Sequence, residues 1–96
     1  MAKQENIKMG NMDAVVVGLS ALGWTLADDS RANRLLALTG IAAADLRAMA
    51  EDPSVLAEVL RFLEGHEPDL VACARQLEID PMDLVKARMA LEGQAT

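Results

Sequence analysis

Apolar residues recur between residues 14 and 27 with the spacing of a helix. Val15, Leu19, Leu22 and Leu26 fall on one helical face, and Val16 extends that face around the helix. No part of the chain alternates apolar and polar residues as a half-buried strand does, and no Asn-Gly hairpin signal occurs. The pattern therefore predicts an all-α fold.

Capping residues divide the chain into about six short helices. An Asp, Ser or Glu side chain ahead of a helix can accept a hydrogen bond from a free amide of the first turn. Three of these residues stand directly before a proline, which starts a helix well because its missing N–H costs nothing there. The predicted caps are Asp13, Ser30, Asp52, Glu67 and Asp80.

The predicted helix ranges follow from these caps. The first three helices cover about 14–27, 31–39 and 43–51, with Gly40 ending the second in a left-handed turn. The next three end at Gly65, at about Leu77 and at Gly93. Residues 1–12 lack periodicity and are expected to form a flexible tail, so that a single all-α domain covers 13–96.

Two stretches of the chain resemble each other at an offset of 38 residues, Ala21 to Ala50 and Val59 to Arg88. Trp24 falls on Phe62, and Asp45-Leu46 falls on Asp83-Leu84. This favours an internal repeat of two related three-helix units in a compact orthogonal bundle. Because identity between the stretches is low, accidental similarity is the alternative.

Composition indicates what fills the core. Hydrophobic residues make up 52% of the chain, but aromatic residues only 2%. A core of Leu, Ala, Val and Met suits helices, because Ala and Leu lead the helix scale. A chain of 96 residues is long enough for one independent core. The predicted core residues are Leu22, Trp24, Leu36, Ile41, Leu46, Leu60, Phe62, Ile79, Leu84 and Leu91.

Charge and cysteine content restrict the partners and the compartment. The net charge of −6 disfavours unaided binding to nucleic acid or to an anionic membrane. The single cysteine, Cys73, excludes an intrachain disulfide and fits a reducing cytoplasm. The uncharged run over 14–27 is too short to span a bilayer, and Asp13 beside it argues against a signal peptide. We therefore expect a cytoplasmic protein.

The run "LLALTGIAAADLRAMAEDPSVLAEVLRFLEGHEPDLVACARQLEIDP" resembles a small bacterial family catalogued as domain of unknown function 3572. The similarity extends from about Trp24 to Leu91, and its most specific part is "LALTGIAAADLR" followed by "VLRFL". The resemblance implies a compact helical domain in the cytoplasm of alphaproteobacteria and assigns no catalytic or binding residue. The family usually has a proline where this chain has Ala43, a departure that weakens the start of the third helix.

The stretch "LALTGIAAADLRAMA" has the shape of a DNA-binding helix-turn-helix. A recognition helix needs outward Arg, Lys, Asn or Gln side chains, but this one offers only Arg47. The equivalent second copy has Lys86 and Arg88 beside Asp83 and Glu92. We expect a structural turn used twice, with a DNA-associated regulator as the alternative function.

Neither catalysis nor metal binding is expected. His66 and Cys73 could form a nucleophile pair, but Glu67-Pro68 should begin a helix after His66, and Cys73 lies among apolar neighbours. His66, Glu67 and Asp69 lack the ligand spacing of zinc sites. We expect no enzyme activity, no metal and no other cofactor.

The last predicted helix has two apolar faces. Leu84 and Leu91 lie on one side, and Met82, Val85 and Met89 form a second stripe on nearly the opposite side. Such a helix is either buried on all sides or presents one face to a partner. The partner interpretation predicts a non-enzymatic protein-interaction module that binds another protein or a second copy of itself.

Overall fold

The structure is a computed structural model that describes the backbone of residues 11–95 and the side chains of residues 14–94. Within that range the chain folds into six helices, which confirms the all-α prediction. They are α1 (Asn11–Leu26), α2 (Asp29–Thr39), α3 (Ala43–Ala48), α4 (Pro53–Glu64), α5 (Glu67–Leu77) and α6 (Pro81–Ala95).

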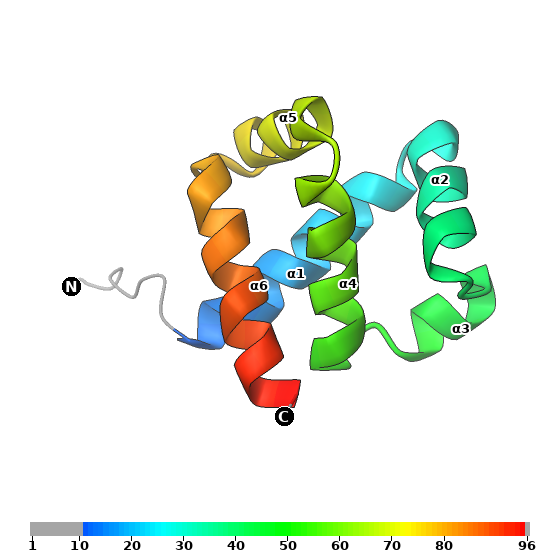
Figure 1. Cartoon of the computed structure of the whole chain (residues 1–96), viewed down its shortest axis with the longest axis horizontal. Coiled ribbons are helices and arrows are strands. Elements are labelled where there is room, and N and C mark those ends of the chain that lie inside the picture. Colours follow the sequence, from blue (N-terminus) through cyan, green and yellow to red (C-terminus); the bar gives the residue numbers. More distant parts are fainter. Residues whose placement is uncertain (1–10, 96) are drawn as a thin grey trace.

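Helix α4 lies at the centre of the fold, and α1 and α6 pack against it and against each other (Figure 1). Helix α5 packs against the same three helices, and α2 packs against α1 and α4. Helix α3 lies at the edge of the molecule, beyond the end of α2. The core therefore forms where α1, α4 and α6 meet.

Helix α4 is central because most of its surface is apolar. Its seven buried residues leave only a narrow exposed side that carries Glu58 and Arg61. Gly18 allows α1 to approach α4 closely, since a Cβ added there would lie 3.0 Å from the Cβ of Leu56. The buried residues of α4 are Val55, Leu56, Ala57, Val59, Leu60, Phe62 and Leu63.

The predicted caps of α2 and α5, Ser30 and Glu67, are wrong. Helix α2 begins before Ser30, and its N-cap is Asp28, whose carboxylate accepts from the Arg31 amide at 2.9 Å. Asp28 has the extended backbone that a cap requires, and a carboxylate also suits the positive end of the helix. At α5 the N-cap position is His66 and not Glu67, because Glu67 already has helical geometry in the turn that contains Pro68. The side chain of His66 makes no capping hydrogen bond.

At α4 and α6 the Asp-Pro pairs begin helices as predicted. Asp52 is the N-cap of α4 and accepts from the Ser54 amide at 2.9 Å. Asp80 stands before α6, but the carboxylate that bonds there belongs to Asp83, which accepts from the Asp80 amide at 3.0 Å. The side chain of Asp83 thus helps to close the first turn of its own helix.

The first and the last helix of the chain, α1 and α6, are both longer than predicted. Helix α1 begins at Asn11, so the expected tail does not extend to residue 12, and Asp13 lies inside the helix and is not its cap. The side chain of Asp13 and residues 1–10 lie outside the described part. Helix α6 continues to Ala95 and does not end at Gly93.

Six of the ten predicted core residues are buried, namely Leu22, Leu46, Leu60, Phe62, Leu84 and Leu91. Trp24, Leu36, Ile41 and Ile79 are half-buried and pack against the core from its rim.

The Arg31 guanidinium stacks 3.6 Å from the ring centre of the half-buried Trp24. In α2 the fully buried residue is Leu35 and not the predicted Leu36. The two residues are adjacent in the sequence and point in directions about 100° apart around the helix.

Candidate functional site

The outward face of α6 carries the apolar stripe that the sequence indicated. Met82 is 58% exposed and Met89 is 59% exposed, while Val85 between them is half-buried. We call Met82, Val85 and Met89 the Met stripe. On the opposite side of the same helix Leu84, Ala87 and Leu91 are buried. The stripe is therefore a surface and not a second core face.

Tertiary contacts hold α6 in this rotation. Its inner face packs against α4 and α1, and the guanidinium of Arg88 donates to the carboxylates of Glu64 and Glu92. Arg61 on α4 also bonds Glu92. The hydrogen bond from Arg88 to Glu64, with a second to Glu92, raises the pKa of Arg88. Helix α6 is thus clamped to α4, and its Met stripe points away from the core.

Lys86 is exposed on the same side of α6 as the Met stripe, four residues after Met82 and three before Met89. Among the side chains that the structure describes, three further large apolar ones are exposed: Val16 on α1 (54%), Leu38 on α2 (75%) and Met49 after α3. The sequence pattern placed Val16 on an extended apolar face and gave no indication of Leu38.

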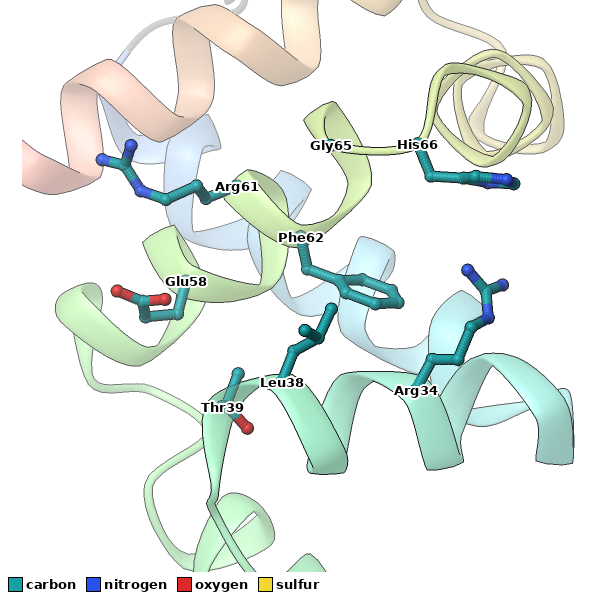
Figure 2. Close-up of a pocket in the computed structure, with 8 residues that line it drawn as sticks. All are labelled: Arg34, Leu38, Thr39, Glu58, Arg61, Phe62, Gly65 and His66. Carbon is teal, nitrogen blue, oxygen red and sulfur yellow. The ribbon is translucent and has the colours of Figure 1, made fainter.

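A hollow of about 360 Å³ lies between α2 and α4, beside the turn that leads into α5 (Figure 2). The ring of Phe62 lies in it, and Leu38 rises from α2 toward that ring. We call this space the α2–α4 hollow. Its lining residues are Arg34, Leu38, Thr39, Glu58, Arg61, Phe62, Gly65 and His66.

Arg34, Asp69 and His66 form a hydrogen-bonded cluster at one end of the α2–α4 hollow. Arg34 Nη2 donates to Asp69 Oδ2 at 2.8 Å, and His66 Nδ1 lies 3.1 Å from the same oxygen. Burial alone would raise the pKa of Asp69, but the hydrogen bond and charge of Arg34, with a smaller effect of His66, hold the pKa below its usual value. The Arg34 guanidinium also lies 5.6 Å from the centre of the Phe62 ring.

His66 and Cys73 have the environments that the sequence suggested. His66 precedes α5 and is exposed, whereas Cys73 is fully buried within α5. Burial raises the pKa of the Cys73 thiol to about 11, which disfavours the nucleophilic thiolate. In the part of the chain that the structure describes, no group of three or more His, Cys, Asp or Glu residues could hold a metal ion.

The helix-turn-helix-like segment consists of α2, a turn with Ile41 half-buried in it, and α3. Helix α3 has six residues, and its exposed side carries both Asp45 and Arg47. Among the described helices, none is long and apolar enough to cross a membrane.

The chain matches, over residues 11–94, the family described as "Protein of unknown function (DUF3572)", and it belongs to that family. The match includes all of α1 to α5 and all of α6 except its last residue. No curated protein and no solved structure is detectably similar to the chain.

Proposed function

We propose that this member of a family of unknown function is a non-enzymatic protein-interaction module of the bacterial cytoplasm that binds through the Met stripe. The observation that carries the proposal is the exposure of Met82 and Met89 on a helix whose opposite face is buried. Leaving apolar side chains in water is unfavourable, and methionine adapts its shape to a partner surface. The net charge of −6 supports a protein partner over nucleic acid.

A second copy of the chain is the partner that the spacing favours. Met82 and Met89 lie seven residues apart, at equal distances from the midpoint between Val85 and Lys86. An antiparallel pair of α6 helices therefore places each Met82 against the Met89 of the second copy. Such a contact is self-complementary, as a two-fold interface requires.

The size of the Met stripe sets the strength of this association. A stable interface buries about 800 Å² on each partner, which is more than three side chains supply. We therefore expect a weak dimer that forms as the concentration rises, unless surfaces beside α6 also contribute.

The test is sedimentation over a range of concentrations with the double variant Met82→Lys, Met89→Lys. We expect the variant to remain monomeric where the wild type associates, while its circular dichroism is unchanged. Leu38→Lys is the control, because it also places a lysine at an exposed apolar position, but on another helix. Loss of helix content in the double variant would mean that the Met stripe is part of the core.

A monomeric wild type would exclude the second copy as partner. The same variants then serve in an affinity capture from the native host with and without nuclease. A protein that is retained by the Leu38→Lys variant and lost by the double variant supports the module. Recovery of duplex DNA in place of a protein supports the alternative regulator, and Lys86→Glu should then weaken that binding at about 50 mM salt.

A further inference from the structure

The α2–α4 hollow is formed by helices other than α6, which carries the Met stripe. It combines an apolar surface with the guanidinium of Arg34. We propose that it binds a small organic anion with an apolar body, such as a carboxylate on a hydrocarbon chain. This inference is independent of the proposed function, because no residue of the Met stripe lines the hollow.

The apolar part of the site consists of Phe62 and Leu38. Phe62 is almost completely buried, so only one side of its ring faces the hollow. Leu38 is 75% exposed, the highest value among the exposed large apolar side chains of the described chain. A hydrocarbon placed between them would remove both surfaces from water. The volume of about 360 Å³ is at the lower end of small-ligand sites, roughly 300–1,000 Å³.

The anion-binding part of the site is at the Arg34 end of the hollow. In Figure 2 the Arg34 guanidinium extends from α2 toward His66, beside the Phe62 ring. Nη2 of Arg34 donates a hydrogen bond to the Asp69 carboxylate. Because a guanidinium has five N–H donors, further donors remain for a ligand.

The charges along the hollow determine the orientation of the ligand. Among the eight lining residues Glu58 is the one carboxylate, and it lies toward the other end together with Arg61. Arg61 is bonded to Glu92, so the positive charge at that end is already paired. The carboxylate of a ligand is therefore expected beside Arg34, with its hydrocarbon chain along Phe62 and Leu38.

A single-headed anion fits this arrangement better than a polyanion. The hollow presents one guanidinium at its anion-binding end, and that guanidinium already bonds the carboxylate of Asp69. A second negative group on the ligand would meet Asp69 or Glu58 and the overall charge of −6. The class of ligand is therefore a monoanion with an apolar chain.

The experiment is a titration of the ¹⁵N-labelled full chain with sodium octanoate, followed by amide chemical shifts. We expect the largest chemical-shift changes at Arg34, Leu38, Phe62 and His66. Octanol, an uncharged compound with a hydrocarbon chain of the same length, should bind at least tenfold more weakly than octanoate. Octanol binding as tight as octanoate binding, or shifts centred on α6, would overturn the proposal.

Two pairs of variants locate the site. Leu38→Asp should weaken octanoate binding at least tenfold, while Met89→Asp, the same kind of change at an exposed position of α6, should leave it unchanged. Arg34→Gln should weaken octanoate binding by about as much as Leu38→Asp. Asp69→Asn breaks the same ion pair but frees the guanidinium, and it should retain or tighten binding.

The pair of Arg34 and Asp69 variants separates ligand binding from a structural role. If the Arg34–Asp69 bond only stabilised the fold around the hollow, both substitutions would weaken octanoate binding together. That result, or equal binding by Leu38→Asp and the wild type, contradicts the proposal. Circular dichroism of each variant confirms that helix content is preserved.

Discussion

Residues 11–48 and 53–95 contain the same three elements in the same order, and we call them the first and the second unit. At an offset of 38 residues the end of α1 matches the end of α4, and α2 matches α5 residue for residue. The left-handed residue after α2, Gly40, matches the left-handed residue after α5, Glu78. These boundaries coincide at the offset of the predicted repeat, which stays a prediction.

The third helices of the two units differ. Helix α3 has six residues and lies at the edge of the molecule, making little contact with α1. Helix α6 has fifteen residues and packs against α4, α1 and α5. Equivalent local sequences therefore lead to different tertiary positions.

Proline placement explains the difference. Pro53 follows α3 closely, and the residue before a proline disfavours helical geometry, so Asp52 is extended and α3 ends early. No proline follows Pro81 in the second unit, and α6 continues to Ala95. At its start α6 has Pro81 where α3 has Ala43, which lacks the preset backbone angle of proline. The Met stripe exists because only the second unit has a long third helix.

The largest expected effect comes from the equivalent buried leucines of the third helices. Leu84→Ala should lower the free energy of unfolding by about 4 kcal/mol, and Leu46→Ala by about 2 kcal/mol. Both side chains are fully buried, but Leu84 lies in the helix that packs against the centre of the fold. Urea denaturation measures both values. Equal losses would show that α3 is as well packed as α6.

A smaller effect is expected at the left-handed positions. Glu78 has a φ of 62°, where a side chain is strained, and Gly40 has a φ of 73°. Glu78→Gly should therefore stabilise the protein by about 1 kcal/mol, and Gly40→Ala should destabilise it by about the same amount. Thermal unfolding of the two variants gives opposite shifts if the turns are equivalent, and shifts of the same sign if they are not.

The smallest effect concerns the ion pair that joins the units. Asp69→Asn removes the carboxylate that α5 offers to Arg34 of α2, and because Arg34 is partly exposed the loss should stay below about 1 kcal/mol at neutral pH. The pKa of Asp69 is lowered in the folded protein, so its stabilisation is present above the ordinary value of 3.8 and is lost as the pH falls through the lowered pKa.

Denaturation of wild type and Asp69→Asn between pH 7 and pH 2 checks this dependence. The difference in unfolding free energy should be constant near neutral pH and should shrink below about pH 4. A difference that persists at the lowest pH would mean that the units are not joined through the charge of Asp69.

Local signals predicted the helices well because they act within one turn. The Asp52-Pro53 and Asp80-Pro81 pairs begin α4 and α6 at the predicted residues. Errors occurred where neighbouring residues competed for one role, as Asp28 and Ser30 did at the start of α2. The apolar period of α6 predicted a core face with Leu84 and Leu91 and a second apolar face, but it could not tell whether the second face is buried or exposed.

Tertiary packing decided that the Met stripe is exposed, and it also formed the α2–α4 hollow. Burial of Leu84 and the clamp of Arg88 on Glu64 turn Met82 and Met89 outward. The α2–α4 hollow requires Leu38 and Phe62 from separate helices, and the Arg34–Asp69 pair joins residues 35 positions apart. Helix type and boundaries follow from interactions between near neighbours, which the order of residues contains directly. The exposure of a face and the meeting of distant side chains depend on how helices pack, which the order of residues determines only through the whole fold.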